Sequence, residues 1–97
     1  MLEKAFQCGR EVNPSQPLSS GVWSYNLTAL NKFQISHSDI ITYHNYSDPA
    51  NHQATIDSLK KYNRPLVCTE YMARKHNSLF TNIMPMLKEQ NIGAINW

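Results

Sequence analysis

Charged residues are scarce in this chain of 97 residues, at 16% of the total, and the net charge at pH 7 is +2. Nucleic-acid-binding domains usually carry a strongly basic surface, so this charge balance argues against a nucleic-acid partner. No apolar run approaches the roughly 20 residues that span a bilayer, so we also expect no membrane partner. Apolar residues make up 41% of the chain, which is ordinary for a globular domain.

Cysteine, histidine and glycine are few, and none is arranged as in a metal or nucleotide site. Cys8 and Cys68 form no CxxC motif and no two histidines are four residues apart, so we expect two buried thiols and no metal site. The three glycines make no glycine-rich turn after a strand. A small doubly wound nucleotide-binding domain, the alternative architecture, is therefore disfavoured.

The two ends of the chain both look cut. The N-terminal stretch MLEKAFQCGREV lacks the basic, apolar and small-residue order of a signal peptide and has a helical pattern instead. The chain ends on a strand-like run, so we expect a piece of a longer protein. The cellular location stays unknown, and a secreted or periplasmic parent is compatible with the sequence.

Helical and strand-like patterns alternate along the chain. Apolar residues recur with helical periodicity in four segments: 2–12, 26–36, 47–63 and 77–91. Strand-forming runs separate them: 18–23, 38–46, 64–70 and 92–97. In the second helical segment, the spacing predicts that Leu27, Leu30 and Phe33 face inward, with Gln34 beside them.

This alternation predicts an α/β fold with parallel strands joined by right-handed helical crossovers. The strands begin near residues 17, 39, 65 and 92, a spacing of 22 to 27 residues. That spacing fits the roughly 30-residue unit of a TIM barrel. We therefore predict a single partial domain over 1–97, with four consecutive βα-type units that make half a barrel. Its two unpaired strand edges favour self-association.

The predicted strand ends carry one acid, one imidazole, one phenol and two indoles. Reactive side chains of a parallel α/β fold gather at the C-terminal ends of its strands. These side chains are Trp23, His44, Tyr46, Glu70 and Trp97. Indoles stack on sugar rings, a phenol can hold a carboxylate, and a carboxylate can attack an anomeric carbon. The set suits carbohydrate chemistry.

Glu70 itself has two interpretations. Side chains alternate along a strand, which places Glu70 on the face of Leu66 and Cys68 and directs it into the centre of the barrel. In that position it can serve as a catalytic nucleophile. Alternatively, Glu70 is a structural residue that caps a helix or forms an ion pair with Arg74.

Three strand-end segments resemble the (β/α)8 glycoside hydrolases of the superfamily that includes cellulases, mannanases and β-galactosidases. TYHNYSD resembles the His-x-Tyr segment of barrel strand six, with His44 and Tyr46. RPLVCTEYMAR resembles strand seven, which carries the nucleophilic glutamate, here Glu70. IGAINW resembles strand eight, whose tryptophan, here Trp97, lies under the attacked sugar. REVNPSQPLSSG is similar to the passage from helix four to strand five.

The resemblance implies a retaining glycosidase, an O-glycosyl hydrolase that acts on an oligo- or polysaccharide without a cofactor. It implies that Glu70 is the nucleophile and that Tyr46 orients it. The substrate-binding residues would be His44, Trp97 and Trp23. The chain would then supply about strands five to eight of the barrel.

One part of the family's machinery is missing from the sequence. The family's acid/base glutamate follows an asparagine at the end of strand four, and this chain contains no Asn-Glu pair. Its other glutamates, Glu3, Glu11 and Glu89, lie in helical patterns. We therefore expect a fragment that is inactive alone. The alternative is a non-catalytic half-barrel that binds carbohydrate or assembles with itself.

Overall fold

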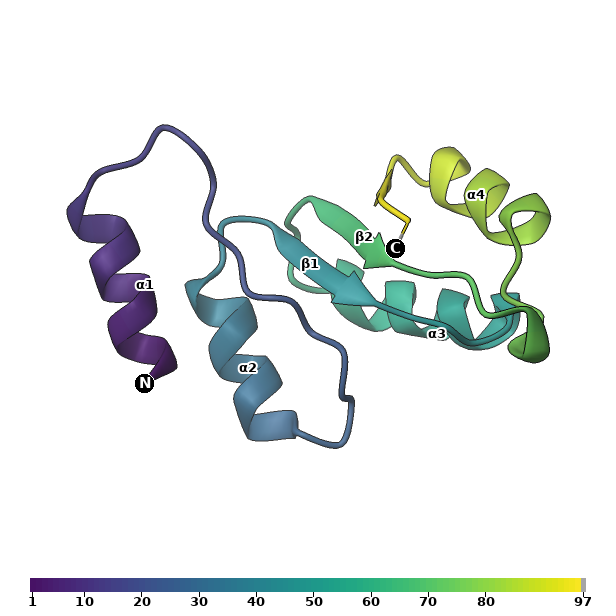
Figure 1. Cartoon of the computed structure of the whole chain (residues 1–97), viewed down its shortest axis with the longest axis horizontal. Coiled ribbons are helices and arrows are strands. Elements are labelled where there is room, and N and C mark those ends of the chain that lie inside the picture. Colours follow the sequence, from purple (N-terminus) through teal and green to yellow (C-terminus); the bar gives the residue numbers. More distant parts are fainter. Residues whose placement is uncertain (97) are drawn as a thin grey trace.

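The computed structural model describes residues 1–96 and shows a small α/β domain (Figure 1). Four α-helices lie in this part of the chain: α1 (Leu2–Glu11), α2 (Thr28–His37), α3 (Pro49–Lys60) and α4 (Phe80–Glu89). The strands are β1 (Ile41–His44), β2 (Leu66–Glu70) and β3 (Gly93–Ala94), and a short 3-10 helix, η1 (Arg74–His76), follows β2. No helix in residues 1–96 is both long and apolar enough to cross a membrane.

The three strands form one open sheet in the order β1-β2-β3, and every pairing is parallel. Helix α3 connects β1 to β2, and α4 connects β2 to β3. The predicted α/β class, the alternation of strands and helices and the parallel direction are thus confirmed. Asp48 caps the start of α3, since its carboxylate accepts a hydrogen bond from the Asn51 N–H at 2.9 Å and Pro49 occupies the first turn.

The first predicted strand, 18–23, is not a strand of this sheet. It makes a single parallel bridge, between Val22 and Tyr43. Side-chain hydroxyls interrupt its ladder, because the Ser20 N–H donates to the Ser38 hydroxyl at 3.1 Å and the Ser19 hydroxyl donates to the Ile40 carbonyl at 2.9 Å. Residues 1–96 therefore hold three strands and not four.

The core lies on one face of the sheet. The strand side chains on this face are buried: Ile41, Tyr43, Leu66 and Cys68. Three helices cover them with apolar side chains of the same cluster: Ile35 of α2, Ile56 and Leu59 of α3, and Ile83 and Leu87 of α4. All three helices that contribute to this core therefore lie against one side of the sheet.

Helix α2 reaches this core through Gln34, as predicted, and through Ile35, which was not predicted to face inward. Its buried residues are Gln34 and Ile35, whereas Leu27 and Leu30 are exposed, so the prediction that these two leucines face inward is wrong. The Gln34 amide explains the difference, because it donates to the Gly21 carbonyl at 3.0 Å and anchors the helix to the segment before β1.

The other face of the sheet carries small and polar side chains. The Ser19 and Thr42 hydroxyls lie 2.8 Å apart on this face. A Cβ built on Gly93 would lie 3.2 Å from the Val67 side chain, so a larger residue there would press on its neighbour. Thr42 and Val67 are half-buried, and Gly93 is exposed. No helix contributes to the buried core from this side, which we call the open face.

Helix α1 lies at the opposite end of the molecule from α4 (Figure 1). The longest dimension of the molecule is 41 Å. A bidentate ion pair between Arg10 and Asp39, with N–O distances of 2.7 and 2.9 Å, holds α1 in place. Cys8 is exposed on this helix, because α1 buries only Phe6; the prediction of two buried thiols therefore holds for Cys68 alone.

Candidate active site

The predicted site residues lie at the C-terminal end of the sheet. His44 and Glu70 are the last residues of β1 and β2, Tyr46 lies two residues beyond β1, and Trp23 follows the bridge at Val22. Trp97 lies outside the described residues. The structure thus brings four of the five predicted side chains to one end of three neighbouring segments.

A β-bulge sets the direction of Glu70. The pairing runs from Tyr43 with Cys68 directly to His44 with Glu70, so Thr69 is an extra residue in β2. Cys68 is buried in the core, whereas Glu70 lies beside His44. The prediction that Glu70 shares the face of Leu66 and Cys68 is therefore wrong, because the bulge breaks the alternation just before Glu70.

His44 identifies the side to which Glu70 turns. A Cβ built on Gly21 would lie 3.7 Å from both the His44 Nε2 and the Thr42 Oγ1. His44 therefore stands on the open face of the sheet, with Thr42. The Glu70 carboxylate, 3.4 Å from His44 Nδ1, lies at the rim of that face.

The two contacts to the Glu70 carboxylate converge on one of its oxygens. The Tyr46 hydroxyl donates a hydrogen bond to Glu70 Oε2, and His44 Nδ1 lies 3.4 Å from the same atom. The other oxygen, Oε1, accepts no hydrogen bond from residues 1–96. The His44 and Glu70 side chains are 26% and 28% exposed, so a ligand can reach them.

The same contact determines the protonation state of Tyr46. The hydrogen bond to the Glu70 carboxylate, with a smaller contribution from burial, raises the pKa of the Tyr46 phenol to about 12. The negative charge of Glu70 disfavours a phenolate beside it. Tyr46 therefore remains a hydrogen-bond donor at neutral pH and holds one carboxylate oxygen in a fixed position.

A pocket of about 230 Å³ opens beside His44 and Tyr46, the two residues that contact the Glu70 carboxylate, and Glu70 itself does not line it. Its lining is aromatic and polar: Trp23, Tyr25, His44, Asn45, Tyr46, Ser47 and Asn51. The Trp23 side chain is 65% exposed, so its indole is available to a ligand. An exposed indole near polar hydroxyl and amide groups suits the alternating apolar and polar faces of a sugar ring.

Four residues of this pocket were not among the predicted site residues: Tyr25, Asn45, Ser47 and Asn51. The Tyr25 hydroxyl donates to the His44 carbonyl at 2.7 Å and supports the end of β1. The buried Asn45 donates from its side chain to Thr55 Oγ1 at 2.9 Å, and its backbone N–H donates to the Glu70 carbonyl at 3.1 Å. The Asn-x-Ser pattern of residues 45–47, which forms an Asx turn with Ser47, was the available signal.

One form of the structural interpretation, an ion pair between Glu70 and Arg74, is absent from residues 1–96. Within residues 1–96, the basic side chain within 4.0 Å of the Glu70 carboxylate is that of His44, so Glu70 does not pair with Arg74. In the same part of the chain, no three His, Cys, Asp or Glu side chains gather as they would around a metal ion.

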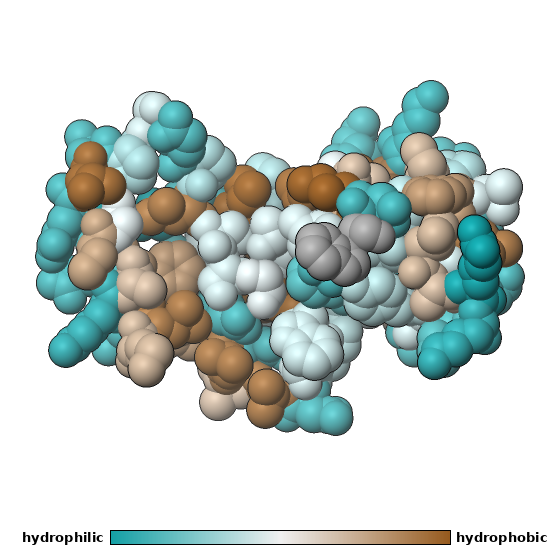
Figure 2. Space-filling view, in the orientation of Figure 1, coloured by the Kyte–Doolittle hydropathy of each residue, from teal (hydrophilic) through white to brown (hydrophobic). Residues whose placement is uncertain are grey.

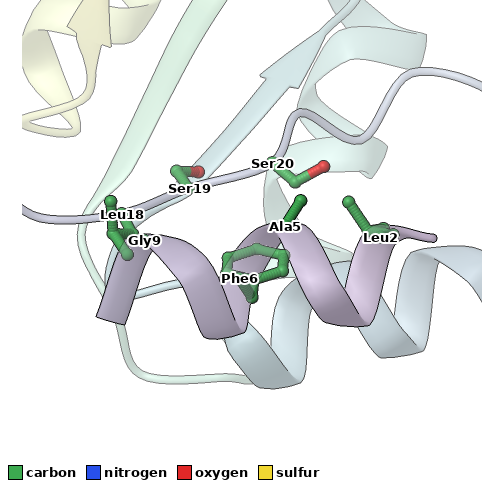
Figure 3. Close-up of a pocket in the computed structure, with 7 residues that line it drawn as sticks. All are labelled: Leu2, Ala5, Phe6, Gly9, Leu18, Ser19 and Ser20. Atoms are coloured by element: carbon green, nitrogen blue, oxygen red, sulfur yellow. The ribbon is translucent and has the colours of Figure 1, made fainter. Parts of the chain in front are cut away.

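A second hollow, of about 220 Å³, lies between α1 and residues 18–20 (Figure 3). Leu2, Phe6 and Leu18 are among the residues that line it, and these residues include no acid, base or thiol. Its chemistry is therefore that of an apolar contact and not that of a reactive site.

Comparisons with known proteins do not assign this site. No protein-family model, curated protein or solved structure matches the chain. Its function has to be inferred from the side chains at the C-terminal end of the sheet and from the chemistry that they support.

Proposed function

We propose that this chain is the nucleophile-bearing half of a retaining glycosidase barrel, and that Glu70 attacks the anomeric carbon of an oligo- or polysaccharide. The observation that carries the proposal is the Glu70 carboxylate at a strand end, held at Oε2 by the Tyr46 hydroxyl. The sheet supports the half-barrel assignment, because its core helices lie on one face and small side chains occupy the other. In a TIM barrel these two faces become the outside and the inside.

The proposed reaction has two displacements. Glu70 Oε1, which has no hydrogen-bond partner in residues 1–96, forms a bond to the anomeric carbon as the bond to the leaving oxygen breaks. A carboxylic acid from another part of the parent protein gives its proton to that oxygen. Water then attacks the anomeric carbon, the same second carboxylate takes the water's proton, and Glu70 leaves as a carboxylate. The configuration at the anomeric carbon is retained.

Covalent trapping in the parent enzyme tests this assignment. A 2-deoxy-2-fluoro glycoside with a good leaving group slows both displacements and lets the glycosyl-enzyme accumulate. We expect peptide mass spectrometry to find the added sugar on Glu70. As a matched control, Glu89→Gln on the exposed surface of α4 should still be labelled at Glu70. Labelling at a different carboxylate would contradict the proposal.

Replacing Tyr46 with phenylalanine should lower kcat by about 10- to 100-fold, the scale expected when one charge-assisted hydrogen bond is lost. The phenyl ring keeps the shape of the site but leaves Glu70 Oε2 without the donor that holds it. The replacement Tyr62→Phe, of an exposed tyrosine just beyond the C-terminal end of α3, is the control. Steady-state kinetics of the parent enzyme measure the effect, and an unchanged kcat in Tyr46→Phe would show that this hydrogen bond has no role in the reaction.

A second candidate is a non-catalytic half-barrel that binds carbohydrate or assembles with itself. It is favoured by the exposed Trp23 and by the two edges of the sheet, since β3 and the segment at Val22 pair on one side only within residues 1–96. This candidate predicts that the 97-residue chain elutes as a dimer or larger species whose size grows with concentration. Sedimentation velocity over a concentration series measures it, and a monomer at every concentration would exclude self-assembly.

A further inference from the structure

The loop after the proposed nucleophile carries three consecutive basic residues, Arg74, Lys75 and His76, which form η1. This loop joins β2 to α4, so it lies at the C-terminal end of the sheet, the end that carries Glu70. Figure 1 shows η1 at the same end of the molecule as the start of α3. Arg74 is four residues from Glu70, which limits the separation of their Cα atoms to about 14 Å.

The loop holds a defined shape. The Ala73 N–H donates to the Ser78 carbonyl at 2.9 Å, and the Ser78 N–H donates back to the Ala73 carbonyl at 3.3 Å, so a small antiparallel bridge closes the loop. The Ser78 hydroxyl, which is buried, accepts from the Met72 N–H at 3.2 Å. The Asn82 amide donates to the Asn77 carbonyl at 2.8 Å and fixes the loop to α4. The backbone that presents the basic residues is thus ordered by its own hydrogen bonds.

The charges of this loop are exposed and are not neutralised within the described residues. Neither Arg74 nor Lys75 lies within 4.0 Å of a carboxylate in residues 1–96. The acids near this end already have partners, since Tyr46 donates to Glu70 and the Asn51 N–H donates to Asp48. Figure 2 shows strongly hydrophilic side chains at the lower right, over the end where η1 lies.

We propose that η1 is a subsite for an anionic substituent of the glycan, either the carboxylate of a uronic acid or a sulfate ester. The inference rests on the proposed function and adds the substrate class, an acidic oligo- or polysaccharide. The Arg74 guanidinium can bind a carboxylate or sulfate through two parallel hydrogen bonds, and Lys75 adds a second positive charge. Loops that follow the strands of a barrel bind the substrate, so a sugar unit next to the one attacked by Glu70 lies within reach of η1.

Binding of defined oligosaccharides to the full 97-residue chain tests this subsite. The probes are an oligogalacturonide, a sulfated dextran oligomer and a neutral cello-oligosaccharide of equal length, measured by isothermal titration calorimetry. The test variant is Arg74→Gln/Lys75→Gln. The control is Lys61→Gln/Lys88→Gln, which removes the same charge at the C-terminal ends of α3 and α4, the opposite end of the sheet.

We expect at least one anionic probe to bind the wild-type chain more tightly than the neutral one. We expect the Arg74/Lys75 variant to bind that probe about tenfold more weakly or worse, the loss expected for charge-assisted hydrogen bonds. The control variant should bind as the wild type does. Preference for the oligogalacturonide or for the sulfated probe identifies the carboxylate or the sulfate as the group bound.

Two results would overturn the subsite. One is an equal loss of affinity in both double variants, which would indicate binding by overall charge. The other is equal affinity for neutral and anionic probes. Either result leaves the trapping of Glu70 in the parent enzyme untouched, so a failure of this subsite is distinguishable from a failure of the glycosidase proposal. Thermal unfolding followed by circular dichroism checks that both variants are folded.

Discussion

Replacing Glu70 with glutamine in the parent enzyme should lower kcat for glycoside hydrolysis by about 10⁴-fold, the scale of loss when a group that forms the covalent intermediate is removed. The amide has nearly the shape of the carboxylate and can still accept from the Tyr46 hydroxyl. It cannot form the glycosyl-enzyme, because its oxygen is a far weaker nucleophile. Steady-state kinetics with an aryl glycoside measure the change. Full hydrolysis by Glu70→Gln would contradict the proposal that Glu70 is the nucleophile.

Replacing Glu70 with alanine distinguishes whether Glu70 is the nucleophile or the acid/base residue. In Glu70→Ala, added azide can occupy the space of the lost carboxylate and attack the anomeric carbon from the same side. The bond to the leaving aryl oxide breaks in that step, and the product is a glycosyl azide of inverted configuration. We expect azide to restore turnover of an activated aryl glycoside. A glycosyl azide of retained configuration would instead assign Glu70 as the acid/base residue.

Acidification should destabilise the folded chain between pH 6.5 and pH 4 through one histidine. His52 of α3 is fully buried, and its Nε2 lies 2.9 Å from the Tyr43 hydroxyl beneath the end of β1. Burial lowers the pKa of His52 to about 4, from its ordinary value of 6.5. The unfolded chain therefore takes up a proton over this range that the folded chain does not bind, and the free energy of unfolding falls as the pH falls.

The expected loss is about 3 kcal/mol, since each unit of pKa difference is worth about 1.4 kcal/mol. Urea denaturation at a series of pH values between 7 and 4 measures it. His52→Gln keeps a hydrogen-bonding side chain beside Tyr43 but does not titrate, so its stability should depend much less on pH. His76→Gln, at an exposed position in η1, is the matched control and should keep the wild-type dependence. An unchanged slope in His52→Gln would show that another group is responsible.

Much of the site was predictable because the order of the strands and the positions of their ends can be read from short stretches of sequence. Apolar runs such as LVC stop at Glu70, and a parallel alternation places the ends of such runs at one edge of a sheet. His44, Tyr46 and Glu70 therefore reach the same place in the structure. Tyr25 and Asn45 were missed because their contributions are hydrogen bonds to a backbone carbonyl of β1 and to a side chain of α3, which leave little trace in composition.

By itself, the sequence determined the class of this fold. Helical and extended periodicities alternate along the chain, and a parallel sheet is the arrangement that buries both with short connections. Local patterns also placed the end of the second strand, β2, at Glu70, because that feature depends on a few neighbouring residues.

Only the tertiary structure decided the geometry of the site. The bulge at Thr69 turns Glu70 away from Cys68 and toward His44, and a bulge is a property of the register between two strands. The segment at Ser20 does not form a strand for a similar reason. The Ser20 N–H donates to the Ser38 hydroxyl, which is 18 residues away in the sequence, and a local pattern cannot indicate that contact. A local pattern states which residues can face one another, and the packing of distant segments selects which of them do.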